Sequence, residues 1–247
     1  MMIVKKRFLR FTVILMISFT FIYAALPQMI HKNHGTSQST GTVSNGRLNN
    51  GYKLPYKGDN FRYYSFFDYY ILGRCYVHSD IYRITLDSYA DLKSFYPDYT
   101  FRIMECSGRK GGRSFPHRTH QNGTSIDFMT PLKKDGKTNL FWDHTGMARY
   151  ALKFDKDGKL TLNKKVEIDF EKLALHVLTL QKNAKKRGYH IKKVILETNL
   201  KDELFNTKYG NQLKTSGIYF VKSLTKRINE LHDDHYHIDF EKTDNYL

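Results

Sequence analysis

The sequence of 247 residues predicts an α+β fold, in which helices flank a central antiparallel sheet. Residues 124–129 and 235–240 each alternate apolar and polar side chains, which is typical of strands. Residues 170–187 instead repeat their apolar side chains at helical spacing. Because the helical pattern lies between the two strand patterns in the sequence, we expect a single fold that combines sheet and helix.

The first thirty residues predict an export signal or a membrane anchor. Residues 1–34 hold five basic residues and no acidic ones, and residues 11–26 carry no charge before Pro27, which is expected to end the apolar segment. The apolar run is long for a signal-peptide core and slightly short for a membrane-spanning helix, which needs about 20 residues. In both cases the following residues leave the cytoplasm, because the basic end stays inside. We therefore expect the periplasm or cell envelope as the location.

Composition divides the rest of the chain in two. Residues 31–50 are rich in Ser, Thr, Asn and Gly and predict a linker. Residues 51–247 contain no second linker and no internal repeat, so they predict one domain. Export permits a disulfide between Cys75 and Cys106 without requiring it, and two buried thiols are the alternative.

Helix signals within this domain are strongest after Asp169, the expected N-cap of a helix that ends before Gly188. His176 lies on this helix and is interpreted as a flank of its packed face. A shorter helix is expected over Asp87–Phe95, closed before Pro97. The other expected elements are strands over 100–106, 189–197 and 235–240 and a long helix over 216–231.

The net charge of +16 favours an anionic partner: nucleic acid, acidic lipid or a carboxylate-rich polymer. Residues 1–34 supply five of these charges, and the surplus persists in the remainder. Export argues against nucleic acid as the partner. A membrane remains a partner through the N-terminal segment if that segment is not cleaved.

Histidines are concentrated near the C-terminus, in HDDHYHIDF, residues 232–240. Side chains on a strand alternate between two faces, so His235, His237 and Asp239 share one face of the expected strand. The apolar side chains lie on the other face, where a core needs them. Two imidazoles about 7 Å apart along a strand can reach one metal, or one can bind while the other acts as a base.

A second polar group precedes and enters the strand over 124–129. Asp127 lies on the non-core face of that strand, and His120 precedes it across a turn at Gly123. We predict that His120, Asp127 and His237 form one ligand set, with the fourth position left to water. Two histidines and a carboxylate with an open position are the composition of a hydrolytic zinc site. The alternative is two solvated polar loops, and residues 233–234 are interpreted as solvated turn residues.

Together the two histidine segments resemble a known family. HRTHQNGTSID, residues 117–127, followed near the C-terminus by HDDHYHIDF resembles the penicillin-insensitive murein endopeptidases. These belong to the group of zinc peptidases that includes lysostaphin-type and D-Ala-D-Ala carboxypeptidase enzymes. The wider H-x6-D and H-x-H signature is met by His120, Asp127, His235 and His237, and the narrower one adds His117 and His232. Further likeness lies in NGRLNNGYKLP (45–55), GRKGGRSFPH (108–117) and KVILETNLKDELF (193–205), so that it covers most of residues 45–240.

The resemblance implies a zinc enzyme that hydrolyses peptide crosslinks of peptidoglycan, at the D-alanyl-diaminopimelate bond, with peptidoglycan peptide stems as its partner. It implies that the three predicted ligands bind Zn²⁺ and that His235 is the catalytic base or stabilises the transition state. His117 and His232 would line the site. Asp239 is expected to orient one of the histidines, with an exposed strand-end acid as the alternative.

Two departures from the family leave the substrate preference open. Ser125 stands where the family usually has a second acid, and Glu105 and Cys106 stand in place of an expected Gly-Asp pair. A D,D-carboxypeptidase of the same group and an inactive cell-wall-binding module on this fold are the alternatives. The intact signature histidines and aspartate argue against the inactive module.

Overall fold

A five-stranded sheet forms the centre of the protein, and helices pack on it, so the predicted α+β fold is confirmed. The computed structural model describes residues 2–115 and 117–243. Residues 1, 116 and 244–247 lie outside that description, and the last four are the end of the predicted domain. All neighbouring strands of the sheet are antiparallel except the last two, which are parallel. In spatial order they are β12 (Tyr189–Ile195), β13 (His235–Lys242), β7 (Ser125–Met129), β6 (Phe101–Ile103) and β4 (Phe61–Tyr63).

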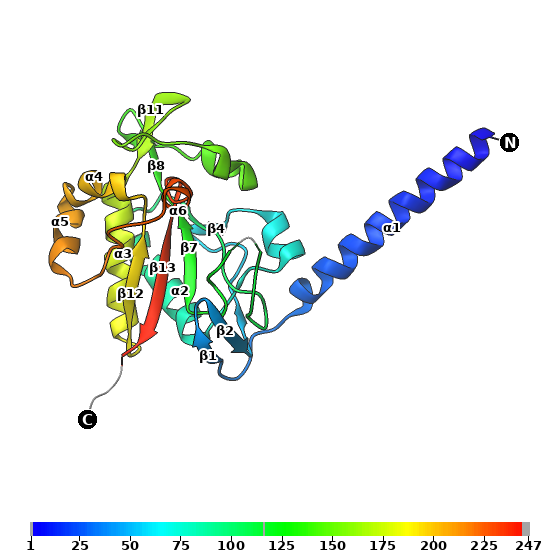
Figure 1. Ribbon diagram of the computed structural model, residues 1–247, viewed down its shortest axis with the longest axis horizontal. Coiled ribbons are helices and arrows are strands. Elements are labelled where there is room, and N and C mark those ends of the chain that lie inside the picture. Colours follow the sequence, from blue (N-terminus) through cyan, green and yellow to red (C-terminus); the bar gives the residue numbers. More distant parts are fainter. Residues whose placement is uncertain (1, 116, 244–247) are drawn as a thin grey trace.

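Smaller elements surround the central sheet (Figure 1). Two strand pairs are formed by β1 (Gln38–Thr42) with β2 (Asn45–Asn49) and by β3 (Tyr52–Lys53) with β5 (Tyr76–Val77). A four-stranded sheet has the order β10 (Lys159–Leu160), β11 (Asn163–Ile168), β8 (Leu132–Lys134) and β9 (Lys137–Thr138). The helices are α1 (Met2–Ile30), α2 (Ser79–Lys93), α3 (Phe170–Lys185), α4 (Lys201–Phe205), α5 (Lys208–Thr215) and α6 (Lys226–Glu230), with short helical turns η1 (Asp68–Leu72), η2 (Trp142–His144), η3 (Gly146–Ala151) and η4 (Thr198–Leu200).

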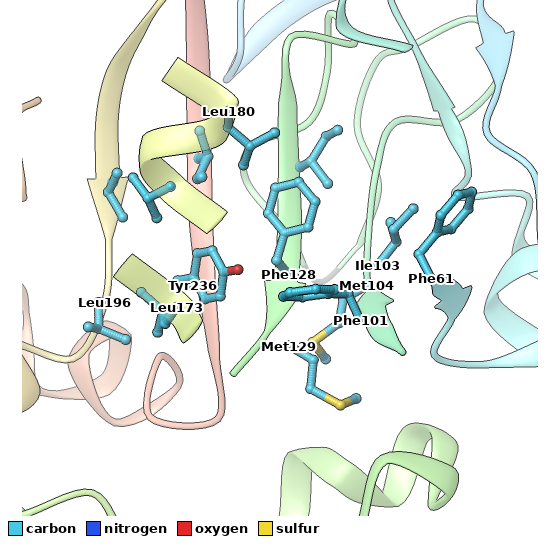
Figure 2. Close-up of a cluster of buried hydrophobic side chains, with 14 of the residues drawn as sticks. Phe61, Phe101, Ile103, Met104, Phe128, Met129, Leu173, Leu180, Leu196 and Tyr236 are labelled. Atoms are coloured by element: carbon cyan, nitrogen blue, oxygen red, sulfur yellow. The ribbon is translucent and has the colours of Figure 1, made fainter. Parts of the chain in front are cut away.

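The main core lies between the central sheet and helices α2 and α3. Figure 2 shows Phe128 of β7 and Tyr236 of β13 in one cluster of buried side chains with Leu173 and Leu180 of α3. These side chains are buried, as the alternation of both strands predicted for their apolar face. Each large apolar side chain removed from water contributes about 1.5–3 kcal/mol to folding. The opposite face of β7 and β13 is thereby left to the polar residues.

Helix α3 begins and ends where its sequence predicted. Asp169 caps it, because its Oδ1 accepts a hydrogen bond from the backbone N–H of Lys172 at 3.1 Å. Gly188 follows the last turn with φ of +68°, a conformation that glycine adopts without a Cβ clash, and its N–H bonds to the carbonyl of Lys185.

Helix α2 is longer than expected and begins eight residues before Asp87. Its N-cap is His78, whose Nδ1 accepts a hydrogen bond from the backbone N–H of Asp80 at 3.1 Å. Buried Ile81 and Ile84 continue the packed face towards the N-terminus. Histidine is an uncommon N-cap. The start of this helix was therefore predicted at a commoner capping residue, Asp87, which lies too far along the chain. The strand predicted over 100–106 is confirmed for its first half, as β6.

The long helix predicted over 216–231 is wrong. Only α6 is helical there, and the residues before it run extended along β12. The N–H of Val194 donates to the carbonyl of Tyr219 at 2.8 Å, and the N–H of Val221 donates back to the carbonyl of Val194 at 3.0 Å. Because these bonds satisfy the edge of β12, strand-like pairing replaces the local helical preference.

The segment 31–50 is not an unstructured linker. It contains the β1–β2 hairpin, whose Leu48 is fully buried in the core. The hairpin also bonds to the loop before β7, with the N–H of Gln121 donating to the carbonyl of Val43 at 2.9 Å. One apolar anchor among polar residues was too weak a pattern to predict this element.

The N-terminal helix α1 projects away from the sheet (Figure 1). Residues 10–30 are long and apolar enough to cross a membrane, so this helix could serve as a signal sequence or an anchor. Pro27 lies inside the helix rather than ending it. The helix touches the folded part near η1, where the ring centroids of Phe21 and Phe66 are 6.3 Å apart and Gln28 accepts a hydrogen bond from the Tyr76 hydroxyl at 2.9 Å.

Both cysteines are free and buried. The structure therefore contains the two buried thiols that were the alternative to a disulfide. Burial raises the pKa of the Cys75 and Cys106 thiols, which keeps them protonated at neutral pH.

His176 lies inside the core rather than on its flank. Its side chain is fully buried, hydrogen-bonds through Nδ1 to the Tyr236 hydroxyl, and packs against the rings of Phe128 and Tyr89. Burial lowers the pKa of His176 from 6.5 to about 3. The imidazole is thus neutral in the folded protein at neutral and mildly acidic pH.

Replacing His176 should flatten the acid dependence of stability. The unfolded chain binds a proton at His176 below pH 6.5, whereas the folded protein binds it only near pH 3. As the pH is lowered between those limits, the free energy of unfolding should therefore fall by about 1.4 kcal/mol for each pH unit because of this residue. We expect His176→Phe to lose this component, as measured by urea unfolding between pH 6 and 4 with excess chelator. Equal slopes in both proteins would contradict the assignment.

Candidate metal centre

The pairing of β7 with β13 builds the centre of the candidate site. In this antiparallel pair His237 lies directly opposite Asp127, with Ile238 opposite Ile126 on the core side. Cross-strand partners have Cβ atoms about 4.5–5.5 Å apart, so the His237 and Asp127 side chains must meet. Both are buried, although they project from the face opposite the main core.

His120 reaches the same point from the loop before β7. Its backbone has φ of 65°, a left-handed conformation that is uncommon outside glycine and concentrates at functional sites. Gly123 then turns the chain into β7 with φ of +76°, where an added Cβ would lie 2.7 Å from Leu48 Cδ2. The β1–β2 hairpin thus packs so closely on this loop that only glycine fits.

Two imidazoles converge on the carboxylate of Asp127. His120 Nε2 lies 3.1 Å from its Oδ2, and His237 Nδ1 lies 2.7 Å from its Oδ1. The other ring nitrogens are held away from this point: His120 Nδ1 by the carbonyl of Ser125 at 3.2 Å, and His237 Nε2 by Asp239 Oδ1 at 2.7 Å. Metal-binding histidines characteristically bond their second nitrogen to a carbonyl or carboxylate in this way. The predicted ligand set is therefore brought together.

Asp239 is a buried partner of His237 rather than an exposed strand-end acid. Its second oxygen, Oδ2, pairs with the Lys193 ammonium at 3.0 Å. Burial by itself would raise the pKa of Asp239, but the charges of His237 and Lys193 outweigh it and lower the pKa. This carboxylate stays ionised and fixes which nitrogen of His237 faces Asp127.

The cluster favours ionised groups despite its burial. Burial would raise the pKa of Asp127, but His120 and His237 hold it well below its ordinary value. Burial would likewise lower the pKa of His237, but the carboxylates of Asp239 and Asp127 outweigh it and raise the pKa to about 10. Negative charge thus concentrates where two imidazoles meet, an environment that also suits a metal cation.

His117 lies closer to the ligands than a residue that merely lines the site. Donor atoms of His117, His120 and Asp127 all lie within 4.8 Å of one another, and this group could hold a metal ion. His117 Nε2 also forms a close ion pair with Glu105. Two overlapping donor sets thus share His120 and Asp127, and they differ in whether His117 or His237 completes them.

Glu105 joins several donors around His117. Its buried carboxylate, 3% exposed, also accepts hydrogen bonds from Arg74 Nη1 and from the Tyr150 hydroxyl, each at 3.1 Å. Burial would raise the pKa of Glu105, but His117 and Arg74 outweigh it and lower the pKa. This residue stands where the family resemblance predicted a different pair.

His235 lies beside the cluster on the same strand face. Its Nδ1 bonds to Asp234 Oδ1 at 2.7 Å, which leaves Nε2 as the nitrogen with a free lone pair. Burial would lower the pKa of His235, but the Asp234 carboxylate outweighs it and raises the pKa. The ring centroid of His232 lies 4.8 Å from that of His235, and the Tyr150 centroid lies 5.7 Å from it.

His232 is neutral at pH 7. Burial and the neighbouring His235 lower its pKa to about 4, and its Nδ1 bonds to the carbonyl of Ile228 at 2.6 Å. It lies next to His235, as expected for a residue that lines the site.

The interpretation of residues 233–234 as solvated turn residues is wrong. Asp234 is 1% exposed and holds His235, and Asp233 accepts a hydrogen bond from the backbone N–H of Phe154 at 3.2 Å. Polar sequence around a turn suggested solvent, whereas the fold packs this turn against residues 153–154. The adjacency of Asp234 to His235 was the one signal of its role in the sequence.

No protein-family model matches the chain, and no curated protein matches it in sequence. The chemistry of the site is therefore inferred from its residues and their geometry.

Two alanine variants should separate the overlapping donor sets. If His120, Asp127 and His237 are the ligands, His237→Ala should weaken metal affinity by at least about 100-fold, since even partners of ligands contribute 10–100-fold. His117→Ala should weaken it far less. Competition with a chromophoric chelator measures both, with Asp98→Ala as an exposed control. A larger loss in His117→Ala would assign the third ligand to His117.

Proposed function

We propose that the protein is a zinc-dependent murein endopeptidase that hydrolyses peptide crosslinks of peptidoglycan, at the D-alanyl-diaminopimelate bond. The observation that carries this proposal is the position of the His235–Asp234 pair beside a cluster of two histidines and one aspartate on the same sheet face. Hydrolytic metal sites combine such a cluster with a base.

Zinc suits the donors that converge here. One carboxylate and two imidazoles, with His237 giving up its extra proton when it binds the metal, leave a coordination position open, as in catalytic rather than structural zinc sites. His120 would bind through Nε2 and His237 through Nδ1, because their other nitrogens are held by Ser125 and Asp239. When bound, zinc supplies Lewis acidity that polarises a carbonyl and lowers the pKa of water.

His235 would act as the general base. Its free Nε2 accepts a proton from the water that attacks the amide carbonyl carbon, and Asp234 stabilises the resulting imidazolium through Nδ1. The carbon–nitrogen bond then breaks, and the imidazolium returns the proton to the leaving amine. His232, neutral at pH 7, adds no competing positive charge beside it.

Peptide stems suit the rest of the chain. The signature residues of the murein endopeptidases occupy this one site, including His117 and His232 at its edge. The apolar helix α1 suits an exported or anchored protein of the periplasm or cell envelope. A net charge of +16 favours a wall rich in carboxylates.

Purified crosslinked muropeptides test the proposal directly. We expect dimers to be converted to monomers, with a chelator blocking the reaction and zinc restoring it, as read by mass spectrometry. Loss of a terminal alanine with dimers left intact would instead establish a carboxypeptidase. Intact, unaltered muropeptides despite bound zinc would contradict hydrolysis.

His235→Ala should retain zinc and lose turnover. Removal of a general base lowers the rate constant by about 100- to 10,000-fold. Metal content and initial rates on muropeptide dimers check this, with the partly exposed His190→Ala as a matched histidine control. Unchanged kcat in His235→Ala would refute its role as base.

A further inference from the structure

A cavity of about 470 Å³ lies apart from the metal cluster. It opens between β4 with the residues that follow it and the turns η2 and η3. Its lining combines exposed apolar side chains, Phe66, Phe67 and Met147, with two cations, Arg62 and Arg102. This volume lies in the range of about 300–1,000 Å³ that is typical of small-ligand sites.

Two tyrosines link this cavity to the metal centre. Tyr64 lines the cavity, and its hydroxyl donates to Glu105 Oε1 at 3.3 Å. Its ring centroid lies 5.9 Å from that of Tyr150, which in turn lies 5.7 Å from His235. The Tyr64 ring in the cavity wall is therefore no more than about 12 Å from the ring of the proposed base His235, a distance that about four extended residues span.

The two arginines in the cavity lack a carboxylate partner. Among the described residues, neither Arg62 nor Arg102 has an Asp or Glu oxygen within 4.0 Å. Arg62 is exposed, with its guanidinium carbon 5.3 Å from the Tyr56 ring centroid. Arg102 is only 4% exposed, and its guanidinium is bonded to backbone carbonyls: Nε donates to Asp143 at 3.2 Å, and Nη1 donates to Thr100 at 3.0 Å and Phe101 at 3.4 Å.

The one acid that lines the cavity does not neutralise both cations. Asp143 is buried and lies 3.8 Å from Arg149 Nη1. The remaining positive charge affects His144, which lines the same cavity. Its pKa is lowered by burial and then by the charges of Arg102 and Arg62. The cavity is thus electropositive and bordered by apolar surface.

We propose that this cavity is a substrate subsite that binds a free carboxylate of the peptide through the exposed Arg62, with the buried Arg102 adding positive charge to the wall and Phe66, Phe67 and Met147 contacting the apolar part of the peptide. This inference rests on the proposed peptidase function, because the ligand is the peptide whose amide is cleaved at the metal centre. Guanidinium groups bind carboxylates in a bidentate, charge-assisted manner. The carboxylate is held beyond the tyrosine pair, and so positions the scissile amide beside His235.

A cycle of protein and ligand changes tests this subsite. The probes are a synthetic crosslinked stem-peptide dimer with free carboxylates and the same dimer with them amidated. Binding is measured by calorimetry on the full chain in detergent, loaded with zinc and carrying His235→Ala to prevent turnover. With Arg62 present, we expect amidation to raise Kd at least about tenfold, the effect of one charged hydrogen bond.

Arg62→Gln should raise the Kd of the free dimer by the same factor and remove the effect of amidation. Arg62 is the residue to change because it is exposed, whereas Arg102 is buried and bonded to backbone. Arg83→Gln, an exposed arginine on α2 that does not line the cavity, should keep the full preference. A preference that survives Arg62→Gln, as when the carboxylate binds the metal instead, overturns the subsite, as does failure of both dimers to bind.

The same probes separate this inference from the proposed function. Cleavage of both dimers at equal rates and with equal affinity by the unaltered chain would overturn the subsite and support the peptidase. Carboxylate-dependent binding that Arg62→Gln removes, with neither dimer cleaved, would establish the carboxylate site and overturn the peptidase.

Discussion

The candidate site depends on the register of β13 against β7. That pairing places His237 opposite Asp127 and directs their apolar neighbours into the main core. A slip of one residue would exchange the two faces of a strand, so that a histidine would enter the core and an isoleucine would enter the site. The packing of Ile238, Ile126 and Tyr236 thus determines the site, because the free energy gained by burying them holds the register.

Burial of so many carboxylates is tolerated because each one has an imidazole or a basic side chain as a hydrogen-bond or ion-pair partner. Asp127 lies between two histidines, Asp234 holds His235, Asp239 holds His237 and Lys193, and Glu105 holds His117. An ionised group left alone in such surroundings would cost several kcal/mol. The resulting network fixes these imidazoles in one orientation before any ligand arrives, which is the preorganisation that the proposed catalysis requires.

Local patterns predicted the two site strands over 124–129 and 235–240, because alternation reports directly which side chains share a face. They also predicted that His120, Asp127 and His237 come together, since both strands had to present their polar faces on one side. Partners from distant parts of the chain were not predictable: Glu105 reaches the site only through the fold. Asp234 was misassigned because its burial depends on a packed turn, and residues 216–231 because sheet-edge pairing outweighs local helix preference.

Structured backbone resumes soon after α1 ends. Residues 31–37 separate Ile30 from β1 at Gln38, a stretch that spans about 25 Å when fully extended. The contact of Phe21 with Phe66 shortens that reach further. In a chain that keeps α1 in a membrane, the candidate metal centre would stay close to the bilayer surface. Cleavage after α1 would leave the residues of the candidate site in place and free them from that distance limit.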